Sequence, residues 1–304
     1  MKPNDRFKNQ PLEFWANIKI LNQRLGFTKK PSAVNPQTNL VVPTVEQIID
    51  AFKSDHLDYS KLIDDKGLTK LGLHIISYMR YRRELLTNAI LPLLMTREQA
   101  QELFYSMKKE LDPNCPLPLN KQKKEKKDYA YLKGIVNMLI CKHKGDYNCD
   151  FSPKELTVIT ENNFPIRVLP RRANGVFPSV INPKAIWEIK EYYYTTTFGS
   201  RVSDSVYAAQ LDGWELCEAQ YKTGKLIKNY LIIDDYYTWW AKGKSYLCRL
   251  VDLMHIGLVD EVIFGREVVT RIPELVEEWK NDLETISKNQ HNKTNSIITN
   301  QMSE

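Results

Sequence analysis

The chain has 304 residues, of which 42% are hydrophobic and 26% are charged, and its formal net charge is +6. This is the composition of an ordinary globular protein that can bury one sizeable core or two unequal ones, and the mild positive charge permits a polyanionic partner without requiring one. No apolar run reaches the length of a membrane span and the five scattered cysteines form no C-x-x-C pair, so we expect no membrane partner, zinc site or disulfide framework, and a reducing, cytoplasmic compartment.

Helical patterns dominate the first half of the chain. Apolar residues recur at helical spacing over 11–26, where Gly26 marks the end, and Thr44 is placed to cap a helix that follows it. Further helices are predicted over 68–91, 96–111 and 129–142. We therefore predict a helical region over residues 1–150, which would supply DNA recognition, dimerisation or both if the partner is DNA.

A lysine-rich run lies between two of these helices, with the sequence Lys-Gln-Lys-Lys-Glu-Lys-Lys over residues 121–127. Lysines contact the phosphates of nucleic acids without sequence preference, so Lys123 and Lys124 are candidate DNA-binding residues. The alternative is a solvated loop that leads into the next helix.

Strand patterns begin at about residue 151. Runs rich in β-branched and aromatic residues predict strands, and amphipathic runs between them predict helices. The strands are expected over 154–160, 176–181, 185–194, 229–234 and 260–265, and the helices over 200–220, 244–257 and 273–287. This order predicts an α/β fold for residues 151–287, with a mixed β-sheet flanked by helices. The polar segment 288–304 is predicted to be disordered.

Glu188 and Lys190 are the most informative pair in the sequence. Strand side chains alternate between faces, so these two point the same way while Trp187 and Ile189 point into a core. A carboxylate beside an ammonium can hold a divalent metal and polarise a phosphate or a water molecule. The alternative is an exposed salt bridge, but the apolar neighbours indicate a buried strand, where an unused charged pair is costly.

This arrangement resembles the PD-(D/E)xK nuclease superfamily, and especially its type II restriction endonucleases. In that family a proline-aspartate begins a hairpin whose second strand carries (D/E)xK; the two acids bind magnesium, and the lysine helps to position or activate the attacking water. Here the triplet is Glu188-Ile189-Lys190, and the family proline falls on Pro178. The resemblance covers roughly residues 151–270 and implies a restriction-endonuclease-like fold behind an N-terminal helical region.

The family aspartate falls on Ser179, so the sequence departs from the pattern at a metal ligand. Magnesium prefers carboxylate and water oxygens, and a neutral hydroxyl is a poor ligand. Three outcomes are open. Ser179 holds a metal-bound water while Glu161 supplies the charge, or Asp204 supplies that charge instead, or the domain has lost catalysis and kept DNA binding.

Three arginines are candidate DNA contacts. Arg171 and Arg172 precede the predicted hairpin, and arginine pairs suit phosphate or guanine recognition, although a solvated turn fits the sequence equally well. Arg201 stands at a predicted helix start, where backbone amides favour a phosphate; the alternative is an ordinary capped helix.

The resemblance implies a metal-dependent DNA endonuclease, in particular a type II restriction enzyme, that hydrolyses phosphodiester bonds of double-stranded DNA with Mg²⁺ or Mn²⁺. Its implied catalytic residues are Glu188, Lys190 and Ser179, with Glu161 or Asp204 as a further metal ligand. Restriction enzymes that cut both strands are usually dimers, so a homodimer is expected. The alternatives are a non-catalytic DNA-binding module on a degenerate nuclease fold, and a modification-dependent or structure-specific nuclease.

Overall fold

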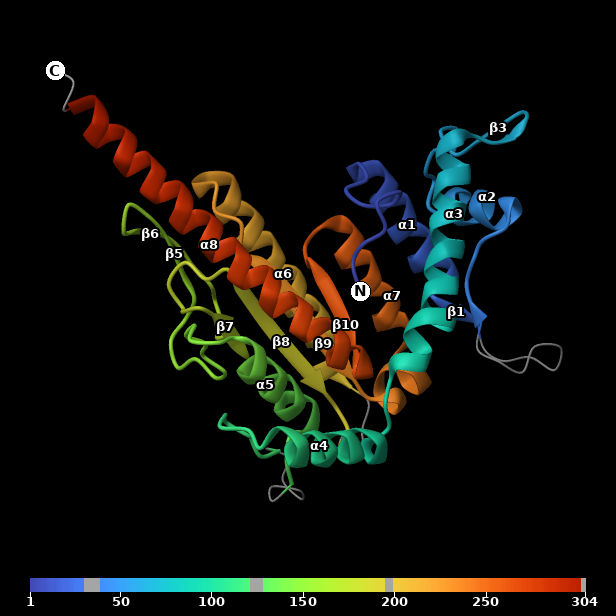
Figure 1. The fold of residues 1–304 in the computed structure, drawn as a ribbon. Coiled ribbons are helices and arrows are strands. Elements are labelled where there is room, and N and C mark those ends of the chain that lie inside the picture. Colours follow the sequence, from blue (N-terminus) through green and yellow to red (C-terminus); the bar gives the residue numbers. More distant parts are fainter. Residues whose placement is uncertain (30–38, 121–127, 195–198, 302–304) are drawn as a thin grey trace.

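A mixed four-stranded sheet, in the order β10-β9-β8-β7, organises the second half of the chain (Figure 1). The computed structural model describes residues 1–29, 39–120, 128–194 and 199–301, and side chains as far as residue 285. The strands are β7 (Gly175–Phe177), β8 (Ala185–Glu191), β9 (Lys228–Asp234) and β10 (Glu261–Phe264). β7 is antiparallel to β8, whereas β8, β9 and β10 are parallel. The predicted mixed sheet with flanking helices is confirmed.

Strand β8 lies inside the sheet and is enclosed on both faces, so its residues from Ala185 to Ile189 are all buried. Trp187 and Ile189 belong to a core cluster on one face, and Ile186 belongs to a separate cluster. This alternation is the one that the sequence predicts, and it directs Glu188 away from the Trp187 cluster.

Three helices pack on the Trp187 face: α4 (Arg97–Leu111), α5 (Tyr131–His143) and α8 (Val268–Gln301) (Figure 1). Trp187 stacks on Trp279 of α8, with ring centroids 5.5 Å apart and planes inclined by 10°. Because α5 buries nine of its residues around its axis, it needs apolar contacts from α4 as well as from the sheet. The sheet's packing unit therefore includes helices from well before residue 150, where the sequence prediction placed the division.

The opposite face is covered by α6 (Ser200–Thr223) and α7 (Lys244–Ile256), which connect successive parallel strands. A π-helical turn (Tyr236–Lys242) precedes α7, and a 3₁₀ turn (Gly265–Glu267) precedes α8. The hairpin of β5 (Val158–Glu161) and β6 (Phe164–Val168) packs against α6 and joins the β7–β8 turn through a bridge between Val158 and Ile181.

Helix α8 extends beyond the rest of the molecule (Figure 1). The helix ends at Gln301 and so includes most of the segment 288–304, for which the sequence predicts disorder. No glycine or proline follows Pro273 in the chain, so nothing in the sequence breaks the helix after its packed part. Residues 302–304 lie outside the described part of the chain.

The N-terminal segment forms a smaller helical layer with its own core. Its helices are α1 (Leu12–Leu25), α2 (Val45–Lys53) and α3 (Lys70–Glu84), and its two-stranded ribbons are β1 (Thr28–Lys29) with β2 (Asn39–Leu40) and β3 (Ile63–Asp64) with β4 (Gly67–Leu68). Thr44 caps α2 in a capping box, as predicted. The helix predicted over 68–91 instead ends at Glu84 and continues as a π turn (Leu85–Ile90) and a 3₁₀ turn (Leu91–Leu93), because Pro92 lacks the N–H that an α-helix needs.

A buried ion pair joins this layer to the sheet domain. Arg82 of α3 donates to Asp252 of α7 with an N–O distance of 2.8 Å, and the Tyr78 hydroxyl donates to the same carboxylate at 2.6 Å. Arg82 also donates to the Asn22 side chain at 2.9 Å. The bonds to Asp252 join residues about 170 positions apart in sequence, and they fix how the two parts of the protein meet.

Two carboxylates at the carboxyl ends of β8 and β9 accept backbone hydrogen bonds from the start of α5 and from the turn before α4. Glu191 accepts from the backbone N–H of Leu132 at 2.7 Å, at the start of α5. Asp234, which is fully buried, accepts from the Met95 N–H at 2.8 Å and from the Tyr193 hydroxyl. Burial raises the pKa of each carboxyl to about 7, against the lowering effect of these hydrogen bonds.

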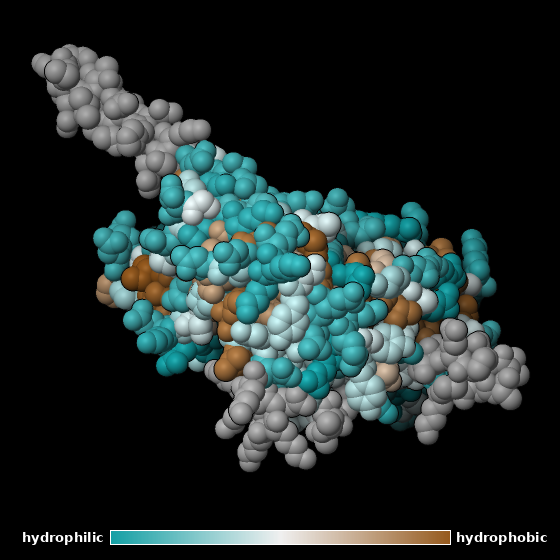
Figure 2. Space-filling view, turned by 60° about the horizontal axis from the view of Figure 1, so that its bottom comes forward, coloured by the Kyte–Doolittle hydropathy of each residue, from teal (hydrophilic) through white to brown (hydrophobic). Residues whose placement is uncertain are grey.

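One face of the molecule is mostly polar. Hydrophilic residues cover most of the face shown in Figure 2, where the coloured hydrophobic residues reach the surface in small separate groups. Among the described helices, none is both long and apolar enough to span a lipid bilayer.

Substitution of Gly175 tests the packing between β7 and β8. A Cβ atom there would lie 2.1 Å from the Trp187 ring, which is held by its stack on Trp279. We expect Gly175→Ala to lower the free energy of unfolding by about 1–3 kcal/mol in urea denaturation. Gly199→Ala is the control, because no atom lies within 4 Å of its added Cβ. Equal effects of the two substitutions would contradict this packing.

Asp234→Asn tests the buried carboxyl at the end of β9. The raised pKa means that the folded state holds the proton more tightly than the unfolded chain, so the native protein loses stability as pH rises from about 4 through about 7. The neutral amide does not ionise, so we expect the variant to gain on the wild type by on the order of 1–3 kcal/mol between pH 5 and pH 8. Denaturation curves at each pH measure this difference, and parallel pH profiles would refute it.

Candidate functional site

The Glu188 and Lys190 side chains meet on the α6 side of β8. Lys190 Nζ donates to Glu188 Oε2 at 2.9 Å, as expected for residues on the same face of a strand. Glu188 is only 6% exposed and Lys190 is half-buried. The pair is therefore enclosed, and the exposed surface salt bridge considered as its alternative is excluded.

Arg171 brings a second carboxylate to this pair. Its guanidinium lies 3.1 Å from Glu188 Oε2 and also binds both oxygens of Asp212, a buried residue in the middle of α6. Glu188, Lys190, Arg171 and Asp212 thus form one cluster, called the carboxylate cluster below. Sequence analysis missed Asp212, although a signal was present: it stands in the stripe of buried positions that also contains Ala209 and Leu216.

Asn174 lies opposite Glu188 on the neighbouring strand. The pairing of Gly175 with Trp187 places residue 174 at this level, and the Ile189 N–H donates to the Asn174 side chain at 2.7 Å. The start of the hairpin, rather than its turn, is therefore beside Glu188. The position opposite Glu188, just before β7, carries a neutral amide.

This register places Ser179 away from Glu188, unlike the position that the sequence prediction gave it. Phe177 pairs with Ala185, so Ser179 lies beyond that pair, in the turn and on the far side from Glu188. The Ser179 side chain is exposed and its hydroxyl donates to the Ile181 carbonyl at 3.0 Å. An antiparallel hairpin brings together residues equidistant from its turn, so a residue in the turn cannot reach the middle of β8.

The two acids proposed as further metal ligands also lie elsewhere. Glu161 is exposed at the end of β5, next to Thr160, which bonds to Asn182 near the amino end of β8. Asp204 is exposed and precedes Asp212 by eight residues, about 12 Å along the helix axis. The structure brings neither acid into the carboxylate cluster.

The predicted DNA contacts are divided by the structure. Arg171 is committed to the carboxylate cluster, whereas Arg172 and Arg201 are exposed, Arg201 in the first turn of α6. Lys123 and Lys124 lie outside the described residues. Contacts of these residues with DNA stay a prediction.

The carboxylate cluster contains two acidic and two basic side chains, whose formal charges cancel. Burial raises the pKa of Asp212, and the guanidinium of Arg171 opposes that shift. The second oxygen of Glu188, Oε1, is buried without a hydrogen-bond partner. An unpaired buried carboxylate oxygen is costly, and it is a natural ligand for a cation or a donor from a substrate.

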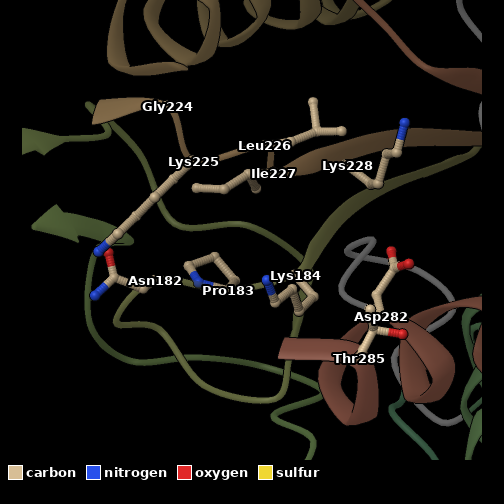
Figure 3. A pocket seen from close by; sticks show the side chains of 10 residues that line it. All are labelled: Asn182, Pro183, Lys184, Gly224, Lys225, Leu226, Ile227, Lys228, Asp282 and Thr285. Carbon is tan, nitrogen blue, oxygen red and sulfur yellow. The ribbon is translucent and has the colours of Figure 1, made fainter. Parts of the chain in front are cut away.

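A cavity of about 630 Å³ lies at the other end of β8 and β9 (Figure 3). Lys184, Lys225 and Lys228 line it from the strand side, and Asp282 of α8 faces them (Figure 3). Two of these lysines are already engaged, because Lys225 donates to the Thr160 carbonyl at 2.5 Å and Lys228 to Asp260 at 2.9 Å. The cavity contains no member of the carboxylate cluster.

Arg171→Met tests whether the guanidinium neutralises the cluster. Its removal leaves Asp212 and Glu188 without their shared cation, and we expect a loss of about 3 kcal/mol in the free energy of unfolding. The double variant with Asp212→Asn removes one of the stranded charges and is expected to lose less than the sum of the two single losses.

Arg167→Met provides the matched control. Arg167 of β6 forms an exposed pair with Glu218, which is on α6 like Asp212. We expect that change to cost at most about 0.5 kcal/mol. Additive effects in the Arg171 and Asp212 cycle would mean that the two residues are not energetically coupled.

Comparison with known proteins assigns the chain to families without assigning an activity. No curated protein and no solved structure matches it. A family model described as Domain of unknown function (DUF7690) matches residues 1–89, and a second, Domain of unknown function (DUF7687), matches residues 95–279. These ranges correspond to the N-terminal helical layer and to the sheet with α4 and α5. Because its model covers more than half of the chain and all four members of the carboxylate cluster, the protein belongs to the DUF7687 family.

Proposed function

We propose that the protein is a metal-dependent DNA endonuclease of the PD-(D/E)xK type, acting on double-stranded DNA as a restriction enzyme. The observation that carries this proposal is the buried Glu188 carboxylate, which has a free oxygen, a lysine at 2.9 Å and a second carboxylate brought close by Arg171. The order of elements supports it, since the E-x-K strand follows an antiparallel partner and precedes a helix and a parallel strand.

The donor set suits magnesium better than zinc. Glu188 and Asp212 offer carboxylate oxygens, and the cluster contains no cysteine or histidine. Among the described residues no group of three or more His, Cys, Asp or Glu side chains could hold a metal. Two carboxylates are nevertheless enough for magnesium, whose other ligands are commonly waters and substrate phosphates.

The roles of the residues follow from their positions. Glu188 and Asp212 would hold the ion, which supplies Lewis acidity and lowers the pKa of bound water. Lys190 orients the Glu188 carboxylate and places a positive charge where the phosphate gains negative charge. Arg171 can bind phosphate oxygens in two-point fashion once a substrate competes with the carboxylates for its guanidinium.

One observation favours a second function, a non-catalytic DNA-binding module on a degenerate nuclease fold. Arg171 contacts both of the carboxylates that would hold a divalent cation. A guanidinium in that position neutralises the acids without metal. The two functions differ in what Arg171 must do. The nuclease requires its guanidinium to leave the carboxylates when the metal binds, and the non-catalytic module requires it to remain bound to them.

Cleavage assays test the proposal. Long double-stranded DNA, unmodified and cytosine- or adenine-methylated, is incubated with the protein in Mg²⁺ or Mn²⁺. We expect metal-dependent cleavage, reduced by on the order of 100-fold or more in Glu188→Gln, Asp212→Asn and Lys190→Ala.

Glu161→Gln is the matched control, because it also removes one carboxylate, but from β5, near the amino end of β8. This variant is expected to cleave normally. DNA binding without cleavage by the wild type in either metal would support the non-catalytic module. Cleavage that survives in Glu188→Gln would overturn the assignment of the site.

A further inference from the structure

A cavity of about 520 Å³ opens between the N-terminal helical layer and the sheet domain. Its walls come from α1, α6 and α7, so it joins the two segments that the family models match separately. The lining includes the aromatic residues Trp15, Phe27, Tyr207 and Trp214, and the amide residues Asn22, Gln23 and Gln210. None of these residues belongs to the carboxylate cluster.

The aromatic part of the lining is unusually accessible. Tyr207 and Trp214 are 57% and 48% exposed, and they lie seven residues apart on α6, hence on the same side of that helix. Large exposed aromatic side chains around a cavity favour a planar apolar ligand. Nucleic acid bases stack on such rings with little dependence on their identity.

The polar part of the lining can bond to the edge of a base. Asn22 is only 5% exposed, and its side-chain oxygen is fixed by Arg82 at 2.9 Å, which orients the amide. Trp15 also lines the cavity and is equally buried. Amide side chains suit a ligand with ring nitrogens and carbonyl oxygens.

The charged part of the lining contains Lys19, Arg249 and Asp252, and because Arg82 pairs with Asp252, the two other side chains leave positive charge for a phosphate. Lys19 is exposed on α1, and the Arg249 guanidinium lies 5.3 Å from the Phe27 ring centre and donates to the Tyr207 hydroxyl at 3.4 Å. Aromatic rings interleaved with cations are typical of surfaces that bind single-stranded or unstacked nucleotides.

Helix α6 connects this cavity to the carboxylate cluster. Asp212 lies on its buried side, while Gln210 and Trp214 line the cavity. The diameter of a helix with its side chains is roughly 10–12 Å, comparable to the length of one or two extended nucleotides. Under the proposed function, a strand bound at the carboxylate cluster would have to pass around α6 to place a nearby base in the cavity.

We propose that this cavity receives a nucleobase that has left the base stack of the DNA. The inference rests on the proposed function, because it makes the base a part of the DNA that the carboxylate cluster would cut. Within double-stranded DNA it favours sites where a base is extrahelical, unpaired or readily unstacked, since such bases cost little to extrude.

Binding in the absence of divalent metal tests this without cleavage. Fluorescently labelled duplexes carry one bulged adenine, one bulged abasic residue or no bulge, and their dissociation constants are measured by anisotropy. We expect the full-length protein to bind the bulged adenine about tenfold more tightly than the other two. Replacing that adenine by 2-aminopurine is expected to give quenched emission when the base stacks on the aromatic lining.

The variants Trp214→Ala and Tyr207→Ala are expected to lose this tenfold preference. Tyr221→Ala is the matched control, because Tyr221 is 95% exposed on the same helix but does not line the cavity. Titration with adenosine monophosphate separates the two sources of a base. Quenching of tryptophan fluorescence by the nucleotide, without any preference for the bulged duplex, would assign the cavity to a free nucleotide and overturn the inference.

The two proposals fail separately. Equal binding of all three duplexes, or a preference that survives in Trp214→Ala, overturns the base cavity while leaving metal-dependent cleavage to be judged by Glu188→Gln. A bulge preference that depends on Trp214, in a protein that cuts no DNA in either metal, would keep the cavity and reject the nuclease.

Discussion

The neutralisation of two buried carboxylates by one guanidinium is the interaction on which the site depends. Arg171 comes from a loop, Glu188 from the middle strand and Asp212 from a covering helix, so three separate parts of the chain meet at one planar cation. Buried acids so close together repel one another unless a counter-charge is shared. The folded arrangement therefore requires either Arg171 or another cation in the same place. The carboxylate cluster therefore holds the loop, the strand and the helix together.

Helix α6 lies between the carboxylate cluster and the cavity lined by α1, α6 and α7. One side packs Val206, Ala209 and Leu216 into the protein and carries Asp212 to the strand. The other side leaves Tyr207 and Trp214 at the edge of a cavity shared with α1. A single rigid element thus holds chemical groups and an aromatic surface at a fixed separation. Under the proposed function, substrate recognition and hydrolysis would be aligned by the helix itself, without a moving domain.

Much of the fold could be predicted from local patterns, because those patterns act over a few residues. The alternation around Glu188 and Lys190 predicted their shared face, and the apolar neighbours predicted burial of the strand. Register was not predictable in the same way. The sequence placed Ser179 at the acid position because it follows Pro178, whereas the pairing of Gly175 with Trp187 puts Asn174 there. In that register Gly175, which has no side chain, leaves room for the Trp187 ring. This is a packing property that a local sequence pattern does not contain. Asp212 was missed for a related reason: its place in the site depends on its bond to Arg171, which is 41 residues away in sequence.

The ion pair of Arg82 with Asp252 has a consequence for how the protein can be divided. A fragment that begins after the first matched segment would retain Asp252 on α7 but lose the guanidinium and the Tyr78 hydroxyl that satisfy it. It would also expose Leu253 and Ile256, which now lie beneath α1 at the floor of the cavity. A shortened recombinant protein of this kind would thus have an unpaired carboxylate beside an exposed apolar surface. That combination favours self-association. The two matched segments are joined by an ion pair that neither segment can form by itself.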